Sequence, residues 1–107
     1  MLIQQALKAI VALSSLLLWS SAAQAKVCVI WDPSDTSVNV RYTPNGKYQS
    51  TLTNGTQVEV VGYRTDPQGR PWASIVQRGS AGQSFVMASL TRDCIRGSLT
   101  PDGRIIR

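Results

Sequence analysis

The sequence of 107 residues contains no histidine. Histidine is the usual general base near neutral pH, a common zinc ligand, and the partner of serine or cysteine nucleophiles. Its absence therefore excludes the commonest designs of small hydrolases and zinc sites. A serine nucleophile would need a lysine base instead, and after the N-terminal segment described next only Lys26 and Lys47 are left.

Long hydrophobic runs are also lacking, apart from the eleven residues Ala9–Trp19. As a helix this run would span roughly 16 Å, about half of a bilayer's hydrocarbon core, which is too short for a permanent anchor. Lys8 precedes it, and Ala23-Gln24-Ala25 follows with the small residues that signal peptidase accepts. The sequence predicts a signal peptide over residues 1–25, cleaved after Ala25. The product is expected in the periplasm or outside the cell, with no membrane anchor.

Cysteine is nearly absent, with Cys28 and Cys94 as the only two. They form no CxxC pair for redox chemistry, and two sulfurs without histidine make a poor metal site. In an exported protein, an even pair is most simply a structural disulfide. The bond would close a loop of about 67 residues and stabilise this small domain by roughly 4 kcal/mol.

Carboxylates are few as well, numbering six. Four of them adjoin turn-forming residues, where an aspartate usually caps its own backbone: Asp32, Asp35, Asp66 and Asp102. Glu59 is expected on the outward face of a strand. A small hydrolase with a carboxylate pair is the least favoured interpretation. The sequence predicts a non-catalytic protein with no metal and no cofactor.

Basic residues outnumber acidic ones. Without Lys8, ten basic and six acidic residues remain, and four arginines come late in the chain: Arg92, Arg96, Arg104 and Arg107. A solvated charged surface explains this excess, and so does attraction to anionic envelope polymers. Nucleic acid would respond to the same charge. Export argues against nucleic acid as the native partner.

The chain after the leader has the pattern of short β-strands, and no stretch shows a helical period over ten residues. Alternation and β-favouring residues predict strands at Val27–Trp31, Val38–Tyr42, Tyr48–Thr53, Gln57–Arg64, Trp72–Gln77 and Ser84–Ala88. Turn signals such as Pro44-Asn45-Gly46 and Asn54-Gly55 separate them. Five or six short strands predict an all-β fold, either a small barrel or a sandwich.

Four short motifs, in this order, resemble bacterial SH3-like (SH3b) domains: Val38-Asn39-Val40-Arg41 with Pro44-Asn45-Gly46, Leu52-Thr53-Asn54-Gly55-Thr56-Gln57-Val58, Gly69-Arg70-Pro71-Trp72-Ala73-Ser74-Ile75-Val76, and Gly82-Gln83-Ser84-Phe85-Val86 with Leu90. Phe85 stands where the family has tryptophan. Cys28, Asp32-Pro33 and Cys94 resemble an exported single-domain subgroup closed by one disulfide.

This resemblance implies a partly open barrel of five to six strands over residues 26–94. Residues 95–107 would then be a short C-terminal extension, either a hairpin or a frayed tail. The family is non-catalytic, and many members bind peptidoglycan. We therefore expect a monomeric module that binds a cell-envelope ligand, either a peptidoglycan peptide or a glycan. The alternative is a protein-interaction module that recruits or restrains an envelope enzyme.

The expected ligand-binding residues are Arg41, Tyr42, Tyr48 and Tyr63. The tyrosines lie at strand ends beside turns, where a ring can stack on a sugar or receive an extended peptide. Ordinary packing explains each tyrosine equally well, and Arg41 can instead be held by a nearby carboxylate or carbonyl. Trp72 and Phe85 stand in apolar strand contexts and are expected in the core.

Overall fold

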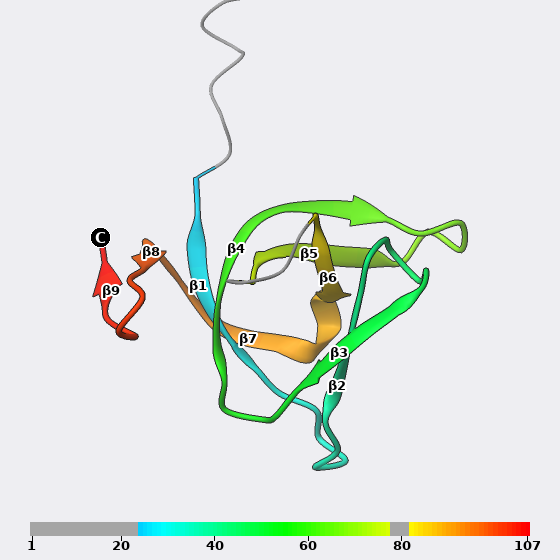
Figure 1. The fold of residues 1–107 in the computed structure, drawn as a ribbon, viewed down its shortest axis with the longest axis horizontal. Helices are drawn as coiled ribbons and strands as arrows, with labels where there is room; N and C mark the ends of the chain where they lie inside the picture. Colours follow the sequence, from blue (N-terminus) through cyan, green and yellow to red (C-terminus); the bar gives the residue numbers. More distant parts are fainter. Residues whose placement is uncertain (1–23, 78–81) are drawn as a thin grey trace, which may run out of the picture.

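The computed structural model describes residues 24–77 and 82–107, so the predicted signal peptide falls almost entirely outside the described part. The strands are β1 (Lys26–Ile30), β2 (Val38–Arg41), β3 (Tyr48–Leu52), β4 (Gln57–Thr65), β5 (Pro71–Val76), β6 (Ser84–Met87), β7 (Thr91–Arg96), β8 (Ser98–Leu99) and β9 (Ile105–Ile106). A short 3-10 helix, η1 (Ala88–Leu90), joins β6 to β7 (Figure 1). The all-β prediction is confirmed. No helix among these residues is long and apolar enough to cross a membrane.

The first six strands lie within one residue, at each end, of the positions expected from the sequence. The strand count was too low, because the sequence interpretation missed β7 and did not choose between a hairpin and a tail for the segment that holds β8 and β9. Strand β7 is an edge strand whose residues after Thr91 are all exposed, so it shows no apolar alternation. It also runs to Arg96, past Cys94, where the barrel segment was expected to end.

Strands β1 to β7 form one antiparallel sheet in the order β3-β2-β6-β5-β4-β1-β7, and β8 pairs with β9 as a separate hairpin. Four positions separate β2 from β1 in this order. In a flat sheet they would lie about 19 Å apart. Their side chains nevertheless share one buried cluster, whose members are Cys28, Ile30, Val38, Val40, Val58, Val60, Ala73, Ile75 and Val86. The sheet is therefore curled around a single core.

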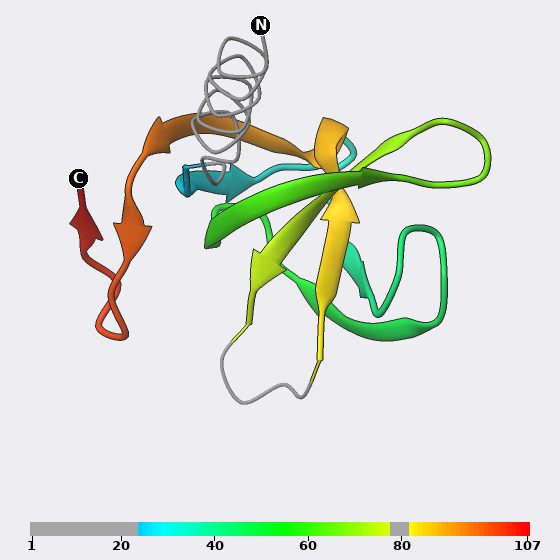
Figure 2. The same ribbon diagram turned by 90° about the horizontal axis from the view of Figure 1, so that it is seen from above.

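Strand β4 is long because it serves two partners. Its first half pairs with β1, and its second half continues as a hairpin with β5 that projects from the body (Figure 2). The register shifts between Val60 and Gly62, as at a β-bulge, which bends a strand. The turn of this hairpin lies on the same side of the molecule as the turn between β2 and β3 (Figures 1 and 2).

Trp72 and Phe85 are buried as expected, but neither belongs to the central cluster. Each alternates along its strand with a cluster residue, Ala73 or Val86, and so points to the other face of the sheet. The Arg64 guanidinium lies 5.5 Å from the centre of the Phe85 ring and covers it. The outer face of β5 and β6 thus carries its own buried aromatic side chains.

The C-terminal hairpin β8–β9 is attached to the sheet. The Leu99 backbone N–H donates a 2.7 Å hydrogen bond to the Glu59 carboxylate on β4. Gly97, at φ 146°, makes the sharp entry to the hairpin, and a Cβ there would lie 2.6 Å from the Ile106 carbonyl oxygen. Glu59 faces away from the core, as the alternation predicts, and holds the hairpin in place.

The predicted disulfide between Cys28 and Cys94 is confirmed, with the two Cα atoms 4.1 Å apart. It joins β1 to the edge strand β7, where the register shifts between Val27 and Val29. Asp93 has a left-handed φ of 54° beside this irregularity. Cys28 is fully buried in the core, so the bond connects the core to the edge of the sheet.

Reduction of this bond is expected to lower the free energy of unfolding by about 4 kcal/mol, since two residues 66 positions apart are no longer linked in the unfolded chain. Thermal or urea melting with and without reductant measures the change. The Cys28→Ala/Cys94→Ala variant is the matched control, because its melting midpoint should be the same with and without reductant. Unchanged melting after thiol titration has shown full cleavage would contradict this account.

Candidate functional site

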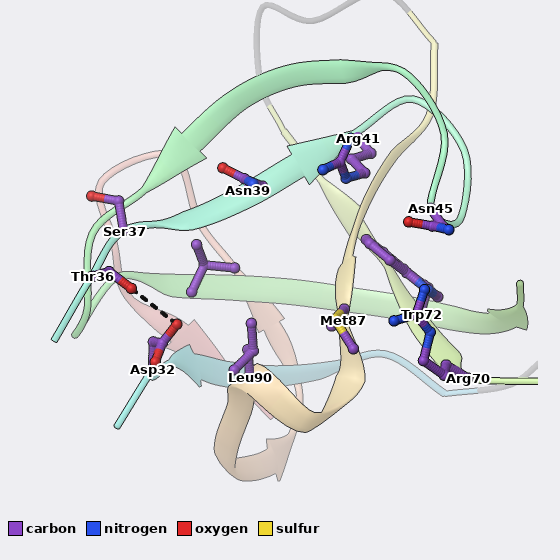
Figure 3. A pocket seen from close by; sticks show the side chains of 11 residues that line it. Asp32, Thr36, Ser37, Asn39, Arg41, Asn45, Arg70, Trp72, Met87 and Leu90 are labelled. Atoms are coloured by element: carbon purple, nitrogen blue, oxygen red, sulfur yellow. Dashed lines mark hydrogen bonds between the residues drawn. The ribbon is translucent and has the colours of Figure 1, made fainter. Parts of the chain in front are cut away.

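A pocket of about 280 Å³ opens where strands β2 and β6 separate. The two strands pair at one position, Arg41 with Phe85, and then diverge. Asn39 and Met87, one alternation further along, line the resulting gap (Figure 3). We call this space the β2–β6 pocket. Its position follows from the strand pairing, because β2 and β6 share fewer paired residues than any other two neighbouring strands of the sheet.

The pocket has an apolar floor and a polar wall. The floor consists of Val38, Trp72, Met87 and Leu90. Asn39 and Arg41 lie on the opposite side, along β2 (Figure 3). Asp32 and Thr36 lie at one end, whereas Asn45 and Arg70 lie at the other. Most small-molecule and peptide sites combine an apolar surface with a few placed polar groups in this way.

The Asp32 end is held by a network of short hydrogen bonds. The Ser34 hydroxyl and backbone N–H donate to one carboxylate oxygen of Asp32 at 2.6 and 2.9 Å, and the Thr36 hydroxyl donates to the other at 3.2 Å. These bonds, those from Ser34 above all, lower the pKa of Asp32. Asp32 is therefore an anion at neutral pH.

Asn54, from the turn between β3 and β4, fixes this loop from behind. Its side-chain oxygen accepts the Asp32 N–H at 2.8 Å, and its amide nitrogen donates to the Asp32 carbonyl at 3.0 Å. The Asn54-Gly55-Thr56 sequence has the form of a glycosylation acceptor. The amide nitrogen that a glycan would need is engaged in these contacts, so Asn54 has a structural role here.

Arg41 projects from β2 into the other end of the pocket. One terminal nitrogen, Nη1, donates a 2.8 Å hydrogen bond to the Gly46 carbonyl in the following turn. A Cβ at Gly46 would overlap the Thr43 hydroxyl, so a larger residue there would force the Thr43 side chain to move. The backbone carbonyl thus holds Arg41 in one orientation while its remaining N–H groups are directed elsewhere.

Asp66 organises the Arg70 end from beneath. Its side chain is fully buried and accepts hydrogen bonds from the Trp72 indole N–H at 2.9 Å, the Arg70 Nε at 2.8 Å, and the backbone N–H groups of Gln68 and Arg70. Burial opposes its ionisation. The hydrogen bonds from Trp72 and Arg70 outweigh burial and hold the pKa of Asp66 at about 2. Trp72 and Arg70 are consequently fixed by one buried anion.

The four sequence-predicted binding residues do not meet in one place. Arg41 lines the β2–β6 pocket, but Tyr42 and Tyr48 do not, although Tyr48 pairs with Arg41 across β2 and β3. Both tyrosines are exposed on the surface beside the turn. Tyr63 lies in a separate depression on the β4–β5 hairpin, with the Lys26 ammonium 4.9 Å from its ring centre.

The sequence analysis missed Arg70, Met87 and the role of Trp72 as part of the pocket floor. One signal was available: an aspartate-initiated turn, Asp66-Pro67-Gln68-Gly69, followed directly by Arg70 and then by Trp72. The chain spacing lets a single carboxylate reach both side chains. No comparable signal exists for Met87, whose place depends on the separation of β2 from β6.

Three of the six carboxylates have pKa values shifted by their surroundings, and all three shifts are downward. The pKa values of Asp32, Asp66 and Asp102 are all lowered by hydrogen bonds, whereas a general acid near neutral pH needs a raised value. Among the described residues, no group of three or more metal-ligating side chains occurs. The pocket offers a ligand oriented N–H donors, an anion and an apolar surface.

Comparisons with known proteins identify no relative, since no protein-family model, curated protein or solved structure matches this chain.

Asp66 should make stability depend on pH in a defined window. Its folded pKa of about 2 lies below the ordinary 3.8, so its stabilising effect is complete above pH 3.8 and is lost as the pH falls through about 2. Asp66→Asn should lower Tm by several degrees at neutral pH, because the charge-assisted hydrogen bonds to Trp72 and Arg70 are lost. The difference in Tm between wild type and Asp66→Asn should then become smaller as the pH is lowered from about 4 to about 2.

Thermal melts of both proteins across this range make the comparison. Asp93→Asn is the control, because it removes an exposed carboxylate and leaves the Asp66 network intact. A gap between wild type and Asp66→Asn that stays constant down to the lowest pH would contradict the assignment.

Proposed function

We propose that this protein is an exported, non-catalytic SH3-like (SH3b) module that binds a cell-envelope ligand, a peptidoglycan peptide or glycan, in the β2–β6 pocket. The observation that carries the proposal is the pocket itself, where two arginines fixed by internal hydrogen bonds stand beside an apolar floor. A site built on rigid supports loses little entropy on binding.

The fold supports the SH3-like part of this proposal. One antiparallel sheet curls around a single core, and its outer strands β3 and β7 are both edges, so the curled sheet is open. A partly open barrel has these two features, a sheet curled around one core and two edge strands that do not pair with each other. Each of the four sequence motifs contributes a residue at or beside the pocket: Arg41, Trp72 and Leu90 line it, and Asn54 holds the loop at its end.

The disulfide supports the proposed location. Structural disulfides persist in oxidising compartments such as the periplasm and the extracellular space. The Cys28–Cys94 bond joins the core to the edge of the sheet and is therefore part of the fold. It agrees with an N-terminal segment that has the pattern of a signal peptide.

A protein partner is the second candidate, supported by the free edge of the sheet at β3. An exposed edge offers unpaired backbone N–H and C=O groups to an added strand. Such a partner would bind saturably and would make no use of the pocket arginines.

Co-sedimentation of the oxidised protein with purified sacculi at low and high salt tests the proposal. High salt screens general attraction between a basic protein and an acidic polymer. Binding in the pocket should survive it and should weaken about tenfold in Arg41→Gln, as expected for the loss of a charge-assisted hydrogen bond. Tyr63→Ala, which alters the separate depression on β4, should bind like wild type.

Two outcomes would reject the proposal. Binding that disappears at high salt, and that at low salt is the same in wild type and Arg41→Gln, would show only general attraction between a basic protein and an acidic polymer. No binding in either condition would favour the protein partner, which capture from an envelope extract would then test. Tyr48→Ala, in the same assay, decides whether the tyrosines beside the β2–β3 turn extend the binding surface.

A further inference from the structure

The two ends of the β2–β6 pocket carry opposite charges. Within the described part of the chain, neither Asp32 nor Arg41 takes part in a salt bridge. Arg70 is paired with the buried Asp66 carboxylate, so Arg41 supplies the uncompensated positive charge at its end. Arg70 adds N–H donors that are already oriented. The pocket is therefore a small dipolar site with an anion at one end and a cation at the other (Figure 3).

Both charges are fixed in place before any ligand arrives. The Asp32 carboxylate is held by Ser34 and Thr36, and the Asn54 side chain fixes the Asp32 backbone. Arg41 is held by the Gly46 carbonyl. Because neither side chain can move easily toward the other, the two charges do not neutralise each other within the protein. Complementary charges on a ligand would satisfy both.

The wall and floor between these ends favour a short chain over a flat ring. Asn39 presents an amide from β2, and an amide can both donate to and accept from a peptide backbone. Met87 and Leu90 supply the opposite apolar side. Trp72 is only 3% exposed, so it offers little ring surface for stacking on a sugar. At about 280 Å³ the pocket is near the lower limit for ligand sites and suits a segment of few residues.

We infer that the β2–β6 pocket binds a short peptide that carries a free carboxylate and an ammonium group, with the carboxylate at Arg41 and Arg70 and the ammonium at Asp32. The guanidinium fork matches carboxylate geometry better than it matches any neutral group. This inference rests on the proposed function and selects the peptide over the glycan. It assigns ligand-binding roles to Asp32, Asn39 and Arg70, none of which the sequence analysis placed among the binding residues.

Alanine peptides of two to four residues are the probes, each with free ends, with a C-terminal amide, with an N-terminal acetyl group, or with both caps. NMR titration of the oxidised, ¹⁵N-labelled exported protein gives the affinities and shows which residues respond. At least one peptide with free ends should perturb pocket residues. Either cap should weaken its binding at least about tenfold, the effect expected for one charge-assisted hydrogen bond.

Two variants assign the ends. In Arg41→Gln the preference for the free acid over the amide should shrink to what Arg70 alone supports, while the acetyl group still weakens binding as in the wild type. In Asp32→Asn the pattern should reverse, with the carboxylate still required and the acetyl group tolerated. If each variant affects one preference and keeps the other, the carboxylate and the ammonium group pair with different residues of the pocket. Arg104→Gln and Asp93→Asn are matched controls on exposed residues outside the pocket and should keep both preferences.

The comparison of capped and free peptides with the wild-type protein decides the matter even if Asp32→Asn disturbs its loop. Equal affinity for all four forms, or no binding of any, would overturn the inference. So would unchanged preferences in both variants. If sacculi bind through Arg41 at high salt while peptides do not, the proposed function stands and the peptide assignment fails. If peptides bind as expected and sacculi do not, the peptide assignment stands and the proposed binding to the cell envelope fails.

Discussion

Cys28 connects the interior of this protein to the edge of its sheet. Its side chain is fully buried among residues of five strands, and its sulfur is bonded to Cys94 on β7. The core is small and consists mainly of valine and isoleucine, so burial alone gives a limited stabilisation. The covalent bond keeps β7 against β1 despite an irregular register. The core that contains Cys28 also holds side chains of β2, β4, β5 and β6, so the bond attaches the edge strand β7 to the part of the sheet that is curled.

The pocket is a consequence of that curl. Strands β2 and β6 meet at one pair and then separate, which leaves a gap that no aliphatic side chain fills. Polar side chains hold the loops around the gap: the half-buried Asn54 lies behind the Asp32 loop, and the buried Asp66 lies beneath Trp72 and Arg70. Asn54 makes two hydrogen bonds to the Asp32 backbone, and the buried Asp66 carboxylate accepts hydrogen bonds from Gln68, Arg70 and Trp72. Because the loops around the gap between β2 and β6 are held in place, the gap is a preformed site.

Local sequence patterns were enough for most of the strands, because alternation with a period of two reports directly on which face of a strand is buried. The pattern at Gln57–Val60, with Val58 and Val60 inside, is a clear case. Strand β7 was not predicted, because its exposed residues show no alternation of apolar and polar side chains. Its pairing depends on β1 lying beside it. The candidate site was harder to predict from the sequence. Arg41 was identified, but the tyrosines expected with it lie outside the pocket.

The sequence by itself determined the all-β class, the position of six strands, the turns, and the disulfide, since each depends on neighbouring residues or on the only available cysteine pair. Only the tertiary structure decided which side chains share a site. Asp32, Arg41, Arg70 and Met87 come from four separate segments, and their meeting depends on how far the sheet curls and where β2 leaves β6. That curl is set by the packing of the whole core, and no local pattern encodes it.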